Sequence, residues 1–317
     1  MGRLMQRRLG AVPVALLLLL VLERPGAAQI PDYARRAVEL TQEYRVFPNV
    51  IYHTANNYDA KLDIYTPYDT TRAVPTVIFF HGGAWYGGSK EEDALWLLPY
   101  LAMGWAAVNV DYRTARVAPA PAAVEDCLCA LSWVVQHAKQ YHFDPQRLVL
   151  TGYSSGGHLA LTSAMIPPSA GFHRECPDST TIKVAAVVNW FGITDVADLL
   201  RGPHERVWAK AWLAHTPGPY ELAVRLSPLT YVRYGGPPVI MIHGDTDETV
   251  PYSQPVRLHR ALDKRNVPNR LFTLHGAGHG GFTPHELTLA YAAIFDFLRA
   301  RGLPTADATP ILGVATK

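Results

Sequence analysis

Residues 147–164, RLVLTGYSSGGHLALTSA, contain a hydrophobic run, a glycine-rich turn and a helix-compatible run. The turn Gly152-Tyr153-Ser154-Ser155-Gly156 matches G-x-S-x-G, and a nucleophile elbow requires this position between a strand and a helix. There the serine hydroxyl projects at the edge of a sheet, and the N-terminus of the following helix favours developing negative charge. We predict that Ser154 is a nucleophile, with a plain glycine-rich turn as the alternative.

Around this stretch, hydrophobic β-rich runs alternate with helical patterns, which predicts an α/β fold with a doubly wound, mostly parallel sheet. Several runs are almost continuously apolar, as expected when helices cover both faces of a parallel sheet. Residues 61–65 alternate between polar and apolar instead, which predicts an edge strand in a hairpin. The predicted parallel strands are residues 74–80, 105–110, 147–151, 184–190, 239–242 and 270–274.

Two capping-box patterns predict helix starts. Ser89 stands three residues before Glu92 and opens a leucine-containing helical pattern that would end at Gly104. Thr283 stands three residues before Glu286, with a proline at the first helical position. We therefore predict one helix after Ser89 and another after Thr283.

The predicted domain organisation is a single α/β domain over residues 29–303, followed by a disordered tail at 304–317. Residues 193–231 interrupt the strand–helix alternation and are longer than an ordinary crossover. We predict that they form a small helical, cap-like insertion over the carboxyl ends of the strands, where open α/β sheets bind ligands. An irregular crossover with core tryptophans is the alternative.

A serine nucleophile needs a base and an acid, which follow it in this type of sheet. His279 lies in a loop rich in glycine, residues 276–281, directly after the last predicted strand, so its imidazole has room to reach the serine. The acid is expected after the preceding strand, where three carboxylates compete: Asp245, Asp247 and Glu248. Spacing alone does not choose between them.

His81-Gly82-Gly83-Ala84-Trp85 follows the strand at residues 74–80. Consecutive glycines there can present backbone N–H groups to an oxyanion, together with the N–H of Ser155 after the nucleophile. A phosphate-binding loop is the alternative, but neither G-K-[ST] nor G-x-G-x-x-G completes it. The sequence therefore favours an oxyanion hole.

The motifs H-G-G-A-W, G-Y-S-S-G-G-H, H-G-D-T-D-E-T-V-P and G-A-G-H-G-G-F occur in this order. Together they resemble the hormone-sensitive-lipase and feruloyl- and acetyl-esterase-like branch of the α/β hydrolases, over roughly residues 45–302. The resemblance implies that Asp247 is the acid, because it stands three residues before Val-Pro. It also implies that Gly83, Ala84 and Ser155 supply the oxyanion N–H groups.

The same resemblance implies a carboxylesterase that acts through an acyl-enzyme on small or polysaccharide-linked esters, with no metal or cofactor. Ala84-Trp85 stands where H-G-G-G lipases have a third glycine. This departure moves the match toward H-G-G-x-W esterases. Trp85 and Trp190 are tentative substrate-pocket residues, although a buried loop anchor is an equal alternative for Trp85. The competing functions are a kynurenine-formamidase-like amidase, an exopeptidase or a non-catalytic binding module.

The 317 residues carry a net charge of +2, with 49% hydrophobic and 18% charged residues. This composition predicts a sizeable core and gives no basic surface for nucleic acid. At the N-terminus, three arginines precede an apolar run over 11–22 and the small residues Gly26-Ala27-Ala28. The pattern predicts a signal peptide over 1–28, and hence a secreted or periplasmic protein without a stable membrane anchor. An uncleaved anchor is the alternative, but twelve residues would span only about 18 Å as a helix.

The chain has three cysteines, Cys127, Cys129 and Cys176. Two positions apart on a helix, Cys127 and Cys129 would face different directions and could not easily pair with each other. Either one pairs with Cys176, or all three remain thiols that pack as small apolar side chains.

Overall fold

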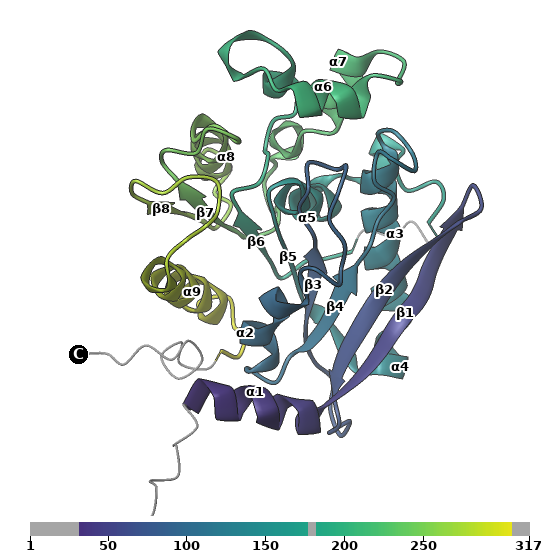
Figure 1. The fold of residues 1–317 in the computed structure, drawn as a ribbon, viewed down its shortest axis with the longest axis vertical. Helices are drawn as coiled ribbons and strands as arrows, with labels where there is room; N and C mark the ends of the chain where they lie inside the picture. The colour runs from purple at the N-terminus through teal and green to yellow at the C-terminus, as the bar shows by residue number, and fades with distance from the viewer. Residues whose placement is uncertain (1–31, 177–181, 306–317) are drawn as a thin grey trace, which may run out of the picture.

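The computed structural model describes residues 32–176 and 182–305. At its centre is one eight-stranded sheet in the order β1-β2-β4-β3-β5-β6-β7-β8 (Figure 1). Strands β1, β2 and β4 pair antiparallel, and all other neighbours pair parallel. The strands are β1 (Tyr44–Ala55), β2 (Tyr58–Pro67), β3 (Val74–Phe80), β4 (Ala106–Val110), β5 (Phe143–Tyr153), β6 (Ala186–Trp190), β7 (Val239–Gly244) and β8 (Asn269–Leu274). The six parallel strands predicted from the sequence are all present, and the α/β-hydrolase fold is confirmed.

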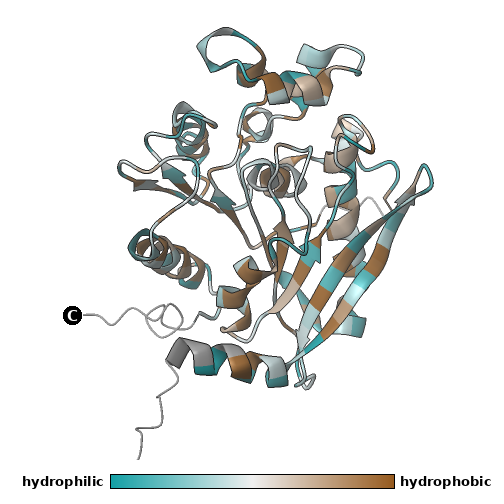
Figure 2. Ribbon diagram, viewed as in Figure 1, coloured by the Kyte–Doolittle hydropathy of each residue, from teal (hydrophilic) through white to brown (hydrophobic). Residues whose placement is uncertain are grey.

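Helices cover both faces of the sheet. One face carries α3 (Ala122–Gln136), α4 (Ala138–Tyr141), α5 (Ser155–Met165) and α8 (Ser253–Asp263), and the other carries α1 (Asp32–Glu43), α2 (Leu98–Leu101) and α9 (Pro284–Arg299). In β3, Ile78 and Phe80 belong to the first core cluster, whereas Val77 and Phe79 belong to the second. The strand is apolar throughout because successive side chains enter two different cores. Figure 2 shows how β1 and β2, by contrast, alternate between hydrophilic and hydrophobic residues.

The prediction that residues 61–65 form an edge strand is wrong in one respect. They lie in the β1–β2 hairpin, but β1 is the edge strand and β2 pairs on both sides. The alternation arises because polar Asp63 is itself buried, where it accepts hydrogen bonds from Asn49 N–H at 2.7 Å and from Lys90 Nζ at 3.1 Å. Charged and backbone hydrogen-bond donors make the burial of this carboxylate possible. In the sequence, such a buried aspartate looks the same as a polar residue that faces solvent.

The two predicted helix starts have different outcomes. Thr283 caps α9 as expected: its Oγ1 accepts from Glu286 N–H, and Glu286 Oε2 accepts from Thr283 N–H. After Ser89, however, the chain forms only turns, a 3₁₀ turn η1 (Ala94–Leu97) and one turn of α-helix, α2. Lys90 is drawn inward, where its N–H donates to Asp111 at 2.7 Å, and Pro99 has no N–H to extend a regular ladder.

Residues 193–231 follow β6 and form α6 (Val207–Leu213), α7 (Pro219–Arg225) and three 3₁₀ turns: η3 (Ala197–Leu200), η4 (Gly202–His204) and η5 (Pro228–Tyr231). We call these residues the 193–231 segment. Helices α6 and α7 stand at the top of Figure 1, at the end of the molecule far from α1. Trp212 of α6 stacks on Trp85, with ring centroids 3.9 Å apart. The segment thus packs on the loop that follows β3.

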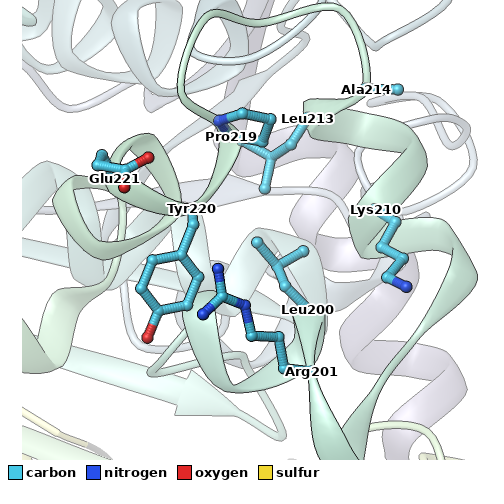
Figure 3. A pocket seen from close by; sticks show the side chains of 8 residues that line it. All are labelled: Leu200, Arg201, Lys210, Leu213, Ala214, Pro219, Tyr220 and Glu221. Atoms are coloured by element: carbon cyan, nitrogen blue, oxygen red, sulfur yellow. The ribbon is translucent and has the colours of Figure 1, made fainter.

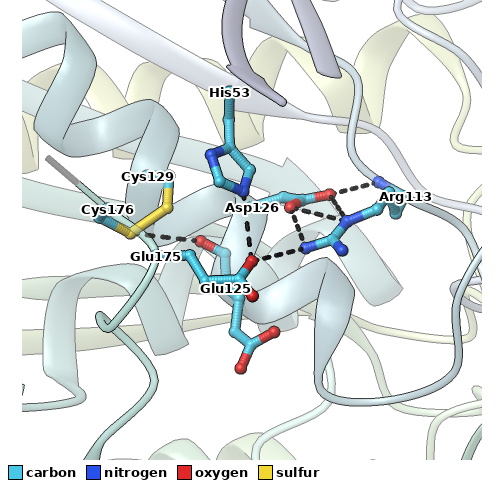
Figure 4. The surroundings of a disulfide bond; sticks show 7 residues. All are labelled: His53, Arg113, Glu125, Asp126, Cys129, Glu175 and Cys176. Atoms are coloured by element: carbon cyan, nitrogen blue, oxygen red, sulfur yellow. Dashed lines mark hydrogen bonds and ion pairs between the residues drawn. A yellow bond between two sulfur atoms is a disulfide. The ribbon is translucent and has the colours of Figure 1, made fainter. Parts of the chain in front are cut away.

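Cys129 of α3 forms a disulfide with Cys176 (Figure 4). Cys127 is a buried free thiol. The structure selects one of the pairings that the sequence left open. Among the described residues, no helix combines the length and apolarity needed to cross a bilayer. The predicted signal peptide, and residues 306–317 of the predicted tail, lie outside the described residues.

Candidate active site

Ser154 occupies a strained turn between β5 and α5. Its backbone has φ 54° and ψ −122°, and its N–H donates to Trp190 O at 2.9 Å. The turn depends on glycine at 156, since a Cβ there would lie 2.0 Å from Phe80 O. Backbone from β3 and from the first turn of α5 therefore approach each other closely, as the G-x-S-x-G pattern predicts.

His279 lies between Ser154 and Asp247. Its Nε2 is 2.9 Å from Ser154 Oγ, and its Nδ1 is 2.7 Å from Asp247 Oδ2. Because an ionised carboxylate can only accept, Nδ1 carries the proton and Nε2 is free to accept the serine proton. The three residues follow β5, β7 and β8, whose carboxyl ends meet at one edge of the sheet. The structure brings the three residues singled out from the sequence into one hydrogen-bonded row.

Asp247 alone among the three candidate carboxylates contacts His279. It is only 6% exposed, and its Oδ1 accepts from the N–H groups of Thr249 and Val250, both at 2.8 Å. Asp245 instead pairs with exposed His275 at 2.8 Å, and Glu248 is exposed. The backbone of the loop thus fixes the orientation of the Asp247 carboxylate, as an acid that orients a histidine requires.

His243 is a further site residue, which the sequence analysis did not single out. Its Nε2 lies 3.2 Å from Asp247 Oδ2 and 2.9 Å from Val250 O. Burial alone would raise the pKa of Asp247, but hydrogen bonds from His243 and His279 lower it well below its usual range. Asp247 therefore stays ionised beside His279. His243 opens the H-G-D-T-D motif, yet its contact with the acid depends on how β7 turns.

The loop after β3 has the shape of a backbone donor site. Gly83, Ala84 and Trp85 have positive φ angles of 114°, 54° and 61°. Gly83 O accepts from the N–H groups of Tyr86 and Gly87, both at 2.9 Å, so the loop is a closed turn. Within residues 32–176 and 182–305, no acceptor is assigned to the N–H groups of Gly83 and Ala84. These N–H groups remain available to a ligand, as an oxyanion hole needs.

Two aromatic contacts hold this loop. A Cβ on Gly82 would lie 2.1 Å from the ring of Tyr153, so the loop and the nucleophile turn are packed directly together. The ring of His81 stacks on Tyr112 at 4.2 Å, and Tyr112 Oη donates to His81 O at 3.0 Å. Burial lowers the pKa of His81, so its imidazole is neutral near pH 7. His81 and Gly82 therefore shape the loop.

Trp85 is a loop anchor and not an exposed pocket residue. It is fully buried, and its Nε1 donates to His158 Nδ1 at 3.2 Å while its ring stacks on Trp212. His158 Nε2 in turn donates to Leu226 O at 2.7 Å. Burial lowers the pKa of His158 to about 4, which keeps the ring neutral and Nδ1 able to accept. Of the two alternatives for Trp85, the structure supports the anchor.

Trp190 also lies behind the surface instead of lining a cavity. It is 1% exposed and packs against Trp96 and Tyr291, with centroids 5.4 and 5.2 Å away. The tentative pocket assignment of Trp190 is therefore corrected. It fills space beneath the residues that do line a cavity, because the run at residues 186–190 is an inner strand covered on both faces.

Two open cavities of similar volume differ in their position relative to the Ser154–His279–Asp247 row. One, of about 430 Å³, lies within the 193–231 segment, where the Arg201 guanidinium covers the Tyr220 ring at 3.8 Å (Figure 3). The other has a volume of about 450 Å³ and is lined by Leu95, Trp96, Leu98, Pro99, Phe191, Gly280, Gly281, Phe282, Leu287 and Tyr291. We call it the His279 cavity, because its wall includes Gly280, the neighbour of His279. Only the second cavity adjoins the Ser154–His279–Asp247 row.

Residues 62–262 match the family model BD-FAE. The chain belongs to the BD-FAE family. The match includes the loop after β3, the nucleophile turn and Asp247, and it ends before His279. This membership confirms the resemblance to the hormone-sensitive-lipase-like branch of the α/β hydrolases.

Similar proteins of known sequence are named as ester hydrolases. The probable carboxylic ester hydrolase LipM of Mycobacterium tuberculosis is 31% identical over 194 residues, which are 59% of this chain and 44% of that protein. Esterase LipC of the same organism is 29% identical over 231 residues, 69% of this chain and 56% of that protein. This BD-FAE family member thus spans about half the length of the curated relatives it matches.

The chain matches similar solved structures over almost their whole length. Esterase 2 of Thermogutta terrifontis phosphonylated by sarin has a TM-score of 0.73 and 26% identity, covering 83% of this chain and 97% of that one. A truncated carbohydrate esterase from gut microbiota has a TM-score of 0.70 and 26% identity, covering 82% of this chain and 96% of that one.

Among the described residues, no group of three or more His, Cys, Asp or Glu could hold a metal ion.

Proposed function

We propose that the protein hydrolyses carboxylic esters through an acyl-enzyme, with Ser154 as nucleophile. His279 Nε2 accepts the Ser154 proton as Oγ attacks the ester carbonyl, and then donates it to the leaving alcohol. Asp247 holds the Nδ1–H tautomer and stabilises the imidazolium. Water, deprotonated by the same imidazole, then releases the acid and restores Ser154. The observation that carries this proposal is the hydrogen-bonded row of Ser154, His279 and Asp247.

The oxyanion of each tetrahedral intermediate rests on the N–H groups of Gly83, Ala84 and Ser155. The open N–H groups of the loop after β3, and the first N–H of α5, support this assignment. Each such donor contributes on the order of 3 kcal/mol to the transition state. The 193–231 segment acts as a cap that keeps this loop in place through Trp212 and Trp85.

The proposed substrates are small or polymer-linked esters with acyl groups such as acetyl or feruloyl. The carbohydrate esterase among the structural neighbours supports a polysaccharide-linked ester, and the predicted signal peptide over 1–28 supports a secreted or periplasmic site of action. After removal of that peptide the protein would act without a membrane anchor.

The test compares wild type with Ser154→Ala on p-nitrophenyl acetate and butyrate. We expect kcat to fall by on the order of 10⁶-fold, as for other serine nucleophiles, while the unfolding midpoint stays near that of wild type. Ser163→Ala is the matched control, since Ser163 is also on α5 and buried but has no role in the mechanism. A fluorophosphonate should add its mass to wild type and not to Ser154→Ala. Wild-type rates in Ser154→Ala would refute the proposal.

A further inference from the structure

The His279 cavity lies beside the proposed catalytic base. The ring of Phe191 packs edge-on against His279, with centroids 4.8 Å apart, and Phe191 is also part of the cavity wall. Gly280 and Gly281, which follow His279 in the chain, form another part of that wall. An ester bound with its carbonyl carbon at Ser154 Oγ can therefore direct one of its two substituents toward this cavity.

The wall of the cavity is apolar. No charged side chain lines it, and its side chains include those of Trp96, Leu98, Phe282, Leu287 and Tyr291. Leu95, at the mouth, is 75% exposed, so apolar surface continues outward from the cavity. A water-exposed apolar wall of this kind gains free energy when an apolar ligand covers it.

The volume is large for an acetyl group. At about 30 Å³ per water-sized group, the 450 Å³ of the cavity corresponds to roughly fifteen such groups. The three heavy atoms of an acetyl group would leave most of this space to water. An alkyl chain of several carbons, or an aromatic ring with its linker, would fill it.

The wall is also held in place next to the nucleophile. Tyr153 Oη donates to the Asp93 carboxylate, 2.8 Å from Oδ2 and 3.0 Å from Oδ1. The Tyr153 ring stacks on Trp96 at 5.3 Å. Since Tyr153 directly precedes Ser154, the segment that carries Trp96 and Leu98 is fixed relative to the reacting hydroxyl. Little ordering would be needed for a ligand to bind there.

We propose that the His279 cavity binds a bulky apolar substituent of the ester, alkyl or aromatic, and makes such esters the better substrates. The inference rests on the proposed ester hydrolysis at Ser154 and adds a substrate class to it. The substituent can belong to the acyl group or to the alcohol, since both flank the reacting carbon.

The experiment uses the full chain and two ester series. One varies the acyl group from acetate to octanoate with p-nitrophenol as the constant alcohol, and the other varies the alcohol from methyl to octyl with acetate as the constant acyl group. For wild type we expect kcat/KM to rise by about fourfold per methylene over several methylenes in one series, as burial of a methylene predicts. The series that responds identifies the source of the substituent.

Substitutions in the cavity wall test whether a chain-length preference comes from the cavity or only from the greater hydrophobicity of the longer esters. Leu98→Trp should fill the cavity and lower the ratio of octyl to short-chain kcat/KM at least tenfold. Leu289→Trp is the matched control, because Leu289 is 45% exposed on α9 and outside the lining, and it should keep the wild-type ratio. Phe282→Ala enlarges the cavity and should shift the preferred length upward. It provides the test if Leu98→Trp does not fold.

The possible outcomes distinguish the two proposals. Hydrolysis of p-nitrophenyl acetate with no length dependence in either series would overturn the cavity assignment and leave ester hydrolysis standing. An unchanged length ratio in folded Leu98→Trp and in Phe282→Ala would overturn it as well. A wild-type protein that hydrolyses no ester of either series would overturn both proposals.

Discussion

Protonation of His158 should make the protein less stable as the pH falls from about 6.5 to 4. The ring is fully buried, and burial lowers its pKa to about 4 even though Leu226 O accepts from Nε2. In the unfolded chain an ordinary histidine has a pKa of about 6.5. Below this pH the unfolded chain binds a proton that the folded chain does not. The free energy of unfolding therefore falls, and the loss is complete once the pH drops below the folded pKa.

The magnitude follows from the two pKa values. Between 6.5 and about 4, at 1.36 kcal/mol per pH unit, the loss amounts to about 3 kcal/mol. Protonation also removes the bond to Trp85, because Nδ1 of an imidazolium can only donate. In the folded protein this protonation occurs only near pH 4, so the anchor of the oxyanion loop would loosen there.

The assay is urea unfolding at pH 7, 6, 5 and 4.5, for wild type and His158→Gln. Glutamine offers a neutral acceptor for Trp85 and a donor for Leu226 but has no proton to gain. The difference in the free energy of unfolding between wild type and His158→Gln isolates the contribution of His158 from that of all other titrating groups. This difference should shrink as the pH falls. His285→Gln, at an exposed position on α9, is the control and should follow wild type. Profiles of wild type and His158→Gln that fall in parallel would refute the reasoning.

Two further changes test the site and its support. Asp247→Asn should lower kcat on p-nitrophenyl acetate by about 10⁴-fold with little change in KM, because the wrong histidine tautomer then faces Ser154. Stopped-flow or extended-time assays would measure the lowered kcat, and a loss below tenfold would speak against Asp247 as the acid. Cys176→Ser removes the disulfide to Cys129, which joins positions 47 residues apart, and should lower the free energy of unfolding by up to about 4 kcal/mol. Chemical denaturation would measure this loss, and Cys127→Ser, which leaves the disulfide intact, serves as its comparison.

Local pattern was enough to predict much of the fold. The nearly continuous apolar runs predicted the parallel strands because helices cover both faces of the sheet and leave few polar positions in them. The nucleophile turn was predictable for a similar reason. Gly156 stands where no side chain fits beside Phe80 O, so the steric need appears in the sequence itself.

Features that depend on distant partners were not predictable from the pattern. Spacing could not separate Asp247 from Asp245, and only the resemblance to relatives chose between them. Trp85 could not be assigned as an anchor, because its burial depends on Trp212 in another part of the chain. The regular helix expected after Ser89 failed because Lys90 turns inward toward Asp63, a contact that no local pattern reveals.

The stack of Trp212 on Trp85 limits how this protein can be re-engineered. Loop grafting treats the stretch between β6 and β7 as an exchangeable module, but here that stretch supports the peptide groups on which the oxyanion would rest. A graft chosen for a new specificity must therefore bring an aromatic side chain to the place of Trp212, or replace Trp85 with a partner suited to the newcomer. Chimeras that ignore this pairing should bind new esters yet turn them over poorly.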